Sequence, residues 1–263
     1  MKVRSTVPAL AWAGLVVLFF VSLARLELLD AARLGRGLRN LGEFTAALFP
    51  PDPTSLPTLG GAMLETIEMA FVGTVIGMVL AVPLALLASP VIFGPAVTGT
   101  VKVLLAAIRT VPSLFWAIVF VVAVGLGPGA GALAVALYSL GYLGKLLYET
   151  FDAVDPEVIE AVRGAGASRL QLARYVVLPE AANGIVAQVL FMFEYNVRAS
   201  SIMGFVGAGG IGYYLLGYMQ LLRYDLLLTA LLVTLLVVIA IDRISALIRR
   251  AYLVPVAPFA PAD

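Results

Sequence analysis

Four charged residues lie within or at the ends of long apolar stretches of this chain: Arg109, Lys145, Glu194 and Arg198. A charge at the centre of a bilayer costs about 2.5–3.5 kcal/mol on insertion scales, so it normally faces a partner or a wet cavity. Guanidinium groups present a planar fork of N–H donors that suits phosphate-like oxyanions. Arg109 has no acidic residue within one helical turn, and if Arg109 and Arg198 converge on a pathway, a phosphate-like anion is the expected passenger.

A structural interpretation of the same charges stays open. Glu194 and Arg198 are four residues apart, as are Lys145 and Glu149. That spacing allows an ion pair on one helix, so each pair can simply neutralise itself. Arg109 lies near the expected inner interface, where its guanidinium can instead reach lipid headgroups.

Several kinds of chemistry are excluded by composition and by motif context. The chain has no histidine and no cysteine, which excludes zinc sites and Cys or His nucleophiles, and its net charge of +1 gives no support for nucleic-acid binding. Gly144-Lys145 lacks the earlier glycine and the Ser/Thr of a phosphate loop. We therefore expect no catalytic residue, no cofactor and no nucleotide site.

Residues Gly207 to Gly212 fit the pattern G-x-G-x-x-G, but no strand is expected before them. Dense glycine at the end of a membrane span is more typical of a re-entrant bend or a close helix contact. Two hypotheses remain for Gly207, Gly209 and Gly210, namely a transport gate and plain helix packing.

The elements that position these residues are predicted to be membrane helices. The 263 residues are 62% hydrophobic and only 13% charged, whereas soluble domains carry about one quarter charged residues. The apolar runs are continuous, which favours helices over barrel strands. We expect an all-α polytopic protein with about six transmembrane helices, near Val7–Ala24, Ala62–Ala88, Val101–Gly125, Gly131–Tyr148, Ile185–Val206 and Tyr224–Leu247.

The distribution of lysine and arginine predicts the orientation. With the amino terminus in the cytoplasm, most of these residues fall in inside segments, so both termini and the loop 151–184 are predicted to be cytoplasmic. The first span has an alternative interpretation as a signal peptide, cleaved after Ser22-Leu23-Ala24.

Residues 27–60 form a separate external segment in this prediction. Within 27–49, leucines and Phe44 recur at helical spacing while Arg33, Arg36 and Arg39 occupy other faces, which indicates an amphipathic helix on the outer membrane surface. Contact with an external partner is the alternative. Residues 251–263, rich in proline, are predicted to be a disordered tail.

The cytoplasmic loop carries clear helix signals. Asp155-Pro156-Glu157 predicts an N-cap followed by proline at the first helical position. We expect one helix over 157–163, a turn at Gly164 and Gly166, a second helix over 168–177, and a stop at Pro179. Such a tight helix–turn–helix segment is rigid enough to transmit a displacement.

The order of residues in this loop resembles the coupling loop of ABC-importer permeases, in which Glu-Ala-Ala is followed after three residues by Gly and after nine more by Ile-x-Leu-Pro. Here Glu160-Ala161-Val162, Gly166 and Val176-Val177-Leu178-Pro179 keep both spacings, with valine replacing the last alanine and the isoleucine. The resemblance implies that a separate ABC ATPase subunit is contacted by Glu160, Ala161, Arg163, Gly166, Leu178 and Pro179.

Other segments are similar to the phosphonate-importer permease family over roughly residues 60–250. They are Arg109-Thr110-Val111-Pro112 with Trp116, Val124–Pro128, Gly141–Lys145, Glu194–Ala199 and Val206–Gly212. This resemblance implies the fold of a type I importer permease, a homodimer in the inner membrane and an extracytoplasmic substrate-binding protein. The implied pathway or gate residues are Arg109, Glu194, Asn196, Arg198, Gly207, Gly209 and Gly210.

The predicted organisation is therefore a first helix (1–26), an external segment (27–60), an importer transmembrane domain (61–250) and a tail (251–263). The predicted interaction partners are membrane lipid, the ATPase subunit, the binding protein and a second copy of this chain. No nucleic-acid partner is expected. Two rival functions stay open: a permease for another solute such as methionine or phosphite, and a secondary transporter, which would need repeated halves with ion-coordinating groups.

Overall fold

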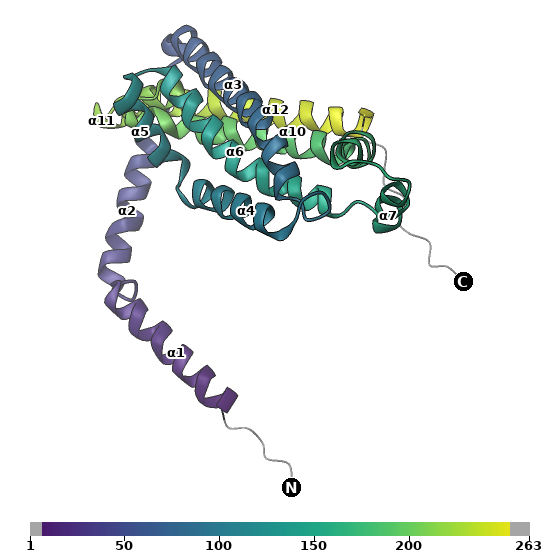
Figure 1. Ribbon diagram of the computed structural model, residues 1–263. Helices are drawn as coiled ribbons and strands as arrows, with labels where there is room; N and C mark the ends of the chain where they lie inside the picture. The colour runs from purple at the N-terminus through teal and green to yellow at the C-terminus, as the bar shows by residue number, and fades with distance from the viewer. Residues whose placement is uncertain (1–6, 253–263) are drawn as a thin grey trace. The chain divides into compact units, whose positions relative to one another are not determined.

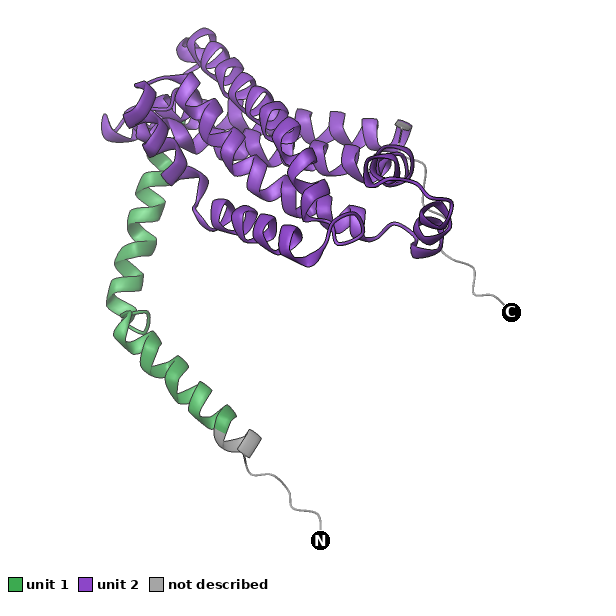
Figure 2. Ribbon diagram, in the orientation of Figure 1, with its two compact units in different colours: residues 1–51 green, residues 52–263 purple. Residues whose placement is uncertain are grey.

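The computed structural model describes residues 7–252, and every regular element in that range is helical. The predicted all-α class is confirmed. Most of the predicted tail, residues 253–263, lies outside the described residues, as do Lys2 and Arg4. The chain divides into two compact units, residues 1–51 and 52–263 (Figure 2).

The first unit contains two helices, α1 (Val7–Arg25) and α2 (Ala31–Ala47). The helix α2 begins at Asp30, whose carboxylate accepts hydrogen bonds from the backbone N–H groups of Ala32 at 2.9 Å and Arg33 at 3.0 Å. It lies within the predicted segment 27–49, and its side chains are exposed along its whole length. The proposed surface-bound role of this helix stays a prediction.

The second unit is a bundle of long helices with short helical connections (Figure 1). Its elements are η1 (Pro53–Ser55), α3 (Leu56–Ala88), α4 (Pro95–Thr110), α5 (Ser113–Val124), α6 (Pro128–Asp152), α7 (Pro156–Gly164), α8 (Arg169–Leu172), the π-helical turn η2 (Ala173–Val177), α9 (Leu178–Glu180), α10 (Ala182–Met203), η3 (Gly204–Val206), α11 (Ile211–Gln220) and α12 (Tyr224–Tyr252).

Three described helices are long and apolar enough to cross a membrane, namely α3, α6 and α12, and bent helix pairs raise this to as many as five. A shorter apolar helix, Ala11–Arg25, occupies the first predicted span. The span predicted near Val101–Gly125 is broken in the structure. The helices α4 and α5 meet at 84°, because Pro112 disfavours helical backbone at Val111, which is extended with ψ 121°.

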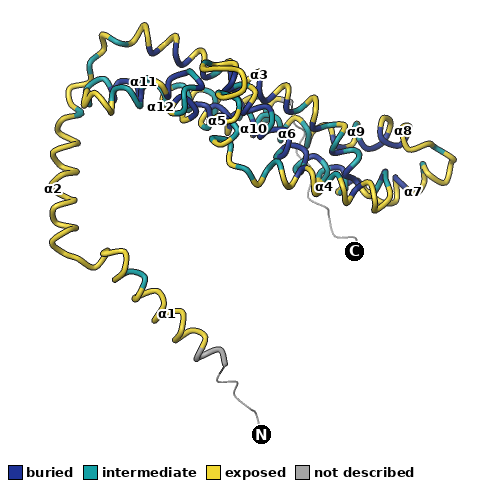
Figure 3. The backbone as a smooth tube through the Cα atoms, turned by 60° about the vertical axis from the view of Figure 1, so that its left-hand side comes forward, coloured by how far each residue is buried: buried dark blue, intermediate teal, exposed yellow. Residues whose placement is uncertain are grey.

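The centre of the bundle is the contact between α3 and α6, where glycines remove the side chains that would hold the helices apart. A Cβ atom added to Gly73 would lie 2.9 Å from the carbonyl oxygen of Ala132, and one added to Gly77 would lie 2.9 Å from that of Ala136. The spacing of Gly73 and Gly77, four residues apart within one span, predicts a small-residue helix contact, and the structure confirms it. Figure 3 shows buried backbone inside this bundle and exposed positions on its outer helices.

A buried polar junction ties α10 to the same centre. The side-chain amide of Asn196, which is 1% exposed, donates hydrogen bonds to the hydroxyl of Thr74 on α3 at 2.8 Å and to that of Ser139 on α6 at 2.7 Å. A polar bond between membrane helices is worth about 0.6–2 kcal/mol. One residue thus fixes the depth of three helices relative to one another.

We predict that Gly77→Ala lowers the thermal stability of the purified protein, because the added methyl group overpacks the α3–α6 contact at a cost of about 1–3 kcal/mol. The matched control is Gly61→Ala on the same helix, where nothing lies within 4 Å of the added atom. That variant should be neutral or slightly stabilising. Equal melting temperatures for the two variants would contradict the close contact.

Candidate coupling and translocation site

The first arm of the loop 151–184 folds as its sequence predicts. Asp155 accepts a hydrogen bond from the backbone N–H of Glu157 at 2.8 Å, and Pro156 occupies the first position of α7. The helix ends at Gly164, and Gly166 takes the left-handed conformation with φ +85°. The predicted N-cap, helix and turn are all confirmed.

The second arm begins with a cap that the sequence prediction did not identify. The backbone N–H of Ser168 donates to the side-chain oxygen of Gln171 at 2.8 Å, while the N–H of Gln171 donates to the Ser168 hydroxyl at 3.4 Å. This reciprocal capping box fixes the angle at which the chain leaves the turn. Its signal, serine followed three residues later by glutamine, was present in the sequence.

The prediction that a regular helix over 168–177 ends at Pro179 is wrong. After α8 the backbone widens into the π-helical turn η2, in which the N–H of Leu178 donates to the carbonyl of Ala173, and Pro179 lies inside the next helical turn, α9. Proline removes one N–H and its ring clashes with the carbonyl four residues before it. The wider turn accommodates that clash, so the helical path continues and bends by 67° into α10.

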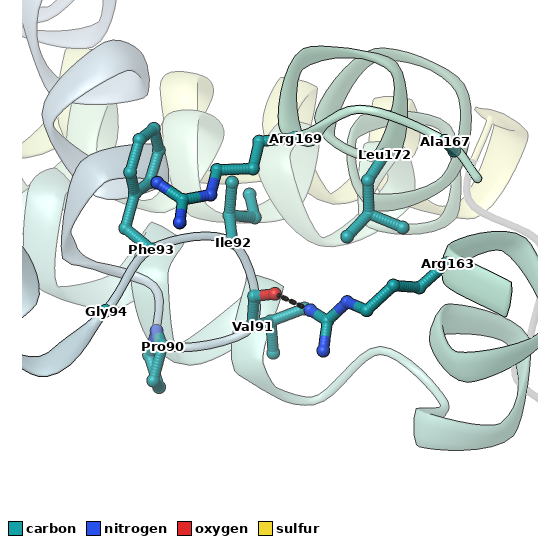
Figure 4. Close-up of a pocket in the computed structure, with 9 residues that line it drawn as sticks. All are labelled: Pro90, Val91, Ile92, Phe93, Gly94, Arg163, Ala167, Arg169 and Leu172. Carbon is teal, nitrogen blue, oxygen red and sulfur yellow. Dashed lines mark hydrogen bonds between the residues drawn. The ribbon is translucent and has the colours of Figure 1, made fainter.

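Two arginines of the loop contact the turn between α3 and α4, as Figure 4 shows. A guanidinium nitrogen of Arg163 donates to the carbonyl of Val91 at 2.6 Å, and the guanidinium of Arg169 lies 5.6 Å from the ring centroid of Phe93. They line a cavity of about 410 Å³ between this turn and the loop. The predicted coupling residue Arg163 is thus bonded within its own chain, and it links α7 to the end of α3.

The outer face of the loop presents the remaining predicted coupling residues and two exposed apolar side chains that sequence reasoning did not single out. Glu160, Ala161 and Pro179 are exposed, and Leu178 is half-buried. Leu170 and Tyr175 are 77% and 68% exposed, although both are large and apolar. An apolar side chain on an otherwise polar loop signals a contact surface, and Tyr175 lines a second cavity of about 510 Å³ beside Gly166.

The predicted ion pair between Glu194 and Arg198 is wrong, because each residue binds a different side chain on α12. A carboxylate oxygen of Glu194 lies 2.6 Å from a guanidinium nitrogen of Arg249, and Arg198 lies 3.1 Å from a carboxylate oxygen of Asp242. The spacing along α10 allowed a local pair, but α12 packs alongside α10 and supplies both partners. The predicted pair of Lys145 and Glu149 is confirmed at 3.1 Å.

The two arginines predicted to hold an anion occupy different surroundings. Arg198 is bound to Asp242 beside α12, whereas Arg109 lies at the end of α4, which packs against α3 and α6. In Figure 1, α6 separates α4 from α12. Within residues 7–252 no contact is shared by the two guanidinium groups, and their joint role stays a prediction.

The glycine segment forms a tightly packed turn between α3 and the start of α6. Gly207, Gly209 and Gly210 have positive φ angles of +83°, +80° and +72°. The N–H of Gly210 donates to the carboxylate of Glu65 at 3.1 Å, and the carbonyl of Gly207 accepts from the N–H of Gly127 at 2.9 Å. The predicted close backbone contact is present, and the gate role stays a prediction.

A charged cluster closes the opposite end of the bundle from the coupling loop. Arg223 lies 2.7 Å from Asp225 and 3.3 Å from Asp52. Hydrogen bonds from Thr54, through its side chain and its backbone N–H, lower the pKa of Asp52, and the hydrogen bond to Asp225 raises the pKa of Arg223. The cluster joins the start of α12 to the chain before α3, and Asp52 is too distant in sequence from Arg223 for spacing to reveal that contact.

Comparison with known proteins gives one family and consistent relatives. Residues 73–254 match the family model described as binding-protein-dependent transport system inner membrane component. The chain is 37% identical to the phosphite transport system permease protein PtxC of Stutzerimonas stutzeri, over 86% of this chain and 82% of that protein. It is also 37% identical to the phosphate-import permease protein PhnE of Mycolicibacterium smegmatis, over 80% of this chain and 40% of that protein.

The fold is shared with a solved transporter. An inward-facing structure of the MetNI methionine ABC transporter superposes with a TM-score of 0.65 and 26% identity, covering 76% of this chain and 98% of the compared chain.

The ion pairs between α10 and α12 should differ in strength. The side chain of Glu194 is 10% exposed and that of Arg249 is 33% exposed, whereas Arg198 and Asp242 are each 45% exposed. Breaking a buried pair leaves a charge without compensation, at a cost of about 3–5 kcal/mol, while exposed pairs contribute about 0–1 kcal/mol. Glu194→Ala should therefore lower the thermal stability much more than Asp242→Ala.

A double-mutant cycle on each pair provides the measurement. We expect a coupling energy for Glu194 with Arg249 that clearly exceeds the value for Arg198 with Asp242. Equal coupling energies would show that water reaches both pairs equally. A coupling energy between Glu194 and Arg198 instead would support the ion pair within α10 that their spacing suggested.

Proposed function

The chain belongs to the family of binding-protein-dependent transport system inner membrane components, and on that basis we propose that it moves a phosphorus oxyanion inward as the permease subunit of an ATP-driven importer. The substrate class is phosphonate, phosphite or phosphate. The chain is a multi-pass membrane protein, and hydrolysis of ATP is assigned to a separate subunit.

The observation that carries this proposal is the cytoplasmic loop from Asp155 to Pro179. It presents a short capped helix, a sharp turn at Gly166 and an exposed apolar face with Leu170 and Tyr175. A rigid projection of this kind suits docking on a soluble partner, because little conformational entropy is lost when it binds. We assign the contact with an ABC ATPase to Glu160, Ala161, Gly166, Leu178 and Pro179.

Arg163 has a different task in this proposal. Because its guanidinium binds the carbonyl of Val91, a displacement of α7 by the ATPase is passed to the turn before α4. The second arm is joined to α10 by a helical path without an intervening loop. The loop therefore drives two sides of the bundle at once, as a rigid-body switch requires.

The phosphorus oxyanion is supported by two relatives at 37% identity, one described for phosphite and the other for phosphate import. The methionine transporter is more distant, at 26% identity. An intramembrane arginine, Arg109, has no ion pair among residues 7–252 and suits an anionic passenger.

The proposed assembly contains two copies of this chain, two ATPase subunits and an external binding protein. The coupling loop and the carboxyl end of α12 lie at the same end of the bundle (Figure 1), which supports a cytoplasmic carboxyl terminus. We also assign the amino terminus to the cytoplasm, from the distribution of basic residues.

Transport in reconstituted vesicles tests the proposal. The permease is incorporated with its ATPase and supplied with the cognate binding protein, and uptake of radiolabelled phosphite, phosphate, methylphosphonate and methionine is measured. We expect uptake of at least one phosphorus oxyanion, with strict dependence on ATP, and no uptake of methionine. Uptake of methionine, or accumulation driven by an ion gradient without ATP, would overturn the assignment.

The turn at Gly166 supplies a sharper test of coupling. Its φ of +85° is unfavourable for a β-branched residue, although nothing lies within 4 Å of an added Cβ atom. Gly166→Val should therefore destabilise the native turn by about 1–2 kcal/mol. That cost corresponds to a factor of about 5–30 in the equilibrium between the native and the distorted turn. We expect co-purification of the ATPase and uptake to fall by that factor.

The matched control is Gly166→Asn, because asparagine tolerates the left-handed conformation. This variant should retain most of the ATPase association. If the valine and asparagine variants behave alike, the backbone conformation of Gly166 plays no part in coupling.

A further inference from the structure

We propose that Tyr138, Tyr142 and Tyr195, together with Arg109, form the site that binds the oxyanion during its passage. This inference rests on the proposed function, since it names the site for that substrate class. It replaces the predicted pair of Arg109 and Arg198 with a different set of partners for Arg109.

The three tyrosines gather from α6 and α10 into one stack. The ring centroids of Tyr138 and Tyr195 are 5.8 Å apart with the planes at 19°, and those of Tyr142 and Tyr195 are 6.4 Å apart at 14°. Tyr138 and Tyr142 follow one another by one helical turn on α6, with centroids 5.6 Å apart. Three phenol groups thus share one place between two helices.

The hydrogen bond between Tyr138 and Tyr195 leaves the hydroxyl proton of Tyr195 available. The hydroxyl of Tyr138 donates to that of Tyr195 across 3.2 Å, so the proton of Tyr195 remains for another acceptor. A hydroxyl that already accepts a bond is a stronger donor, because chains of hydrogen bonds polarise one another. Tyr195 is 37% exposed, whereas Tyr138 is 9% exposed, so the available O–H lies on the accessible side.

Arg109 is placed beside this stack by close backbone packing. A Cβ atom added to Gly141, which lies between Tyr138 and Tyr142 on α6, would be 3.0 Å from the backbone nitrogen of Arg109. The corner after Arg109 is fixed by Trp116, whose ring N–H donates to the carbonyl of Ile108 at 3.3 Å. The backbone of Arg109 therefore lies at the contact between α4 and α6, within one turn of α6 from both Tyr138 and Tyr142.

The position of the stack is held by the polar junction at Asn196. Asn196 follows Tyr195 on α10, and the Ser139 hydroxyl to which it donates follows Tyr138 on α6. The bond that joins these helices therefore lies one residue from each hydroxyl of the tyrosine pair. A site built on rigid helices with such support is organised before the ligand arrives.

The chemistry of the cluster selects an anion. Three rings can also surround a cation, but here they are stacked on one another, which covers ring faces that a cation would need, and the cationic residue Arg109 lies on the helix packed against α6. One guanidinium and one phenolic donor bind an oxyanion through a small number of charge-assisted bonds. Moderate affinity suits a transport site, which must also release its passenger.

Equilibrium binding to the purified permease–ATPase complex, without the binding protein, tests this site separately from transport. Radiolabelled phosphate and methylphosphonate are the anionic probes and choline is the cationic one. We expect the wild-type complex to retain an anion and not choline. Tyr195→Phe and Arg109→Gln should each weaken anion binding about tenfold or more, since each removes a bond to a charged ligand while the ring stack stays.

Tyr148→Phe is the matched control, because Tyr148 lies on α6 outside the stack, with Lys102 above its ring. It should leave anion binding unchanged. The site is rejected if the wild-type complex binds neither anion, if it prefers choline, or if Tyr195→Phe and Arg109→Gln both bind as the wild type does. If vesicles with the wild-type complex take up phosphorus oxyanions while both variants bind the anion normally, the proposed function stands and only the tyrosine site is rejected.

Discussion

Helices inside a bilayer gain little by excluding solvent from one another, because lipid chains are as apolar as their side chains. Close packing and polar bonds must therefore hold this bundle together. The contact between α3 and α6 meets the first need, since Gly73 and Gly77 let one backbone approach the carbonyl groups of the other. Asn196 meets the second need by binding Thr74 and Ser139 at once. The positions of the remaining helices follow from this centre.

The charges near α10 complete the frame. Glu194 and Arg198 both bind side chains of α12, so two ion pairs join these helices at different heights. Only the first pair is largely shielded from solvent, and it is the one that α12 cannot lose without leaving a charge buried. As a result α12 is bound to move with α10, while α4, which packs on the other side against α3 and α6, is free of both pairs.

Local sequence signals predicted the local structure well, but they did not predict which side chains from distant segments contact one another. The N-cap at Asp155 and the turn at Gly166 each depend on one segment, and both were found from the sequence. The partners of Glu194 and Arg163 lie 55 and 72 positions away, and the spacing of charges along α10 favoured a local pair. The tyrosine stack joins residues 57 positions apart, so no periodicity within one helix reveals it.

The two arms of the coupling loop lead to the two halves of the proposed anion site. One arm, through Arg163 and Val91, reaches the turn before α4, and α4 carries Arg109 at its far end. The other arm continues through the π-helical turn into α10, which carries Tyr195. A helix transmits displacement along its length with little bending, so a movement of the loop that shifts α4 against α10 changes the distance between the guanidinium and the phenolic donor. In this proposal two such bonds hold the anion, and moving the two donors apart leaves only one of them within reach, which weakens binding. Release of the passenger would then need no change in charge or chemistry, only relative movement of the two helices to which the loop 151–184 is joined.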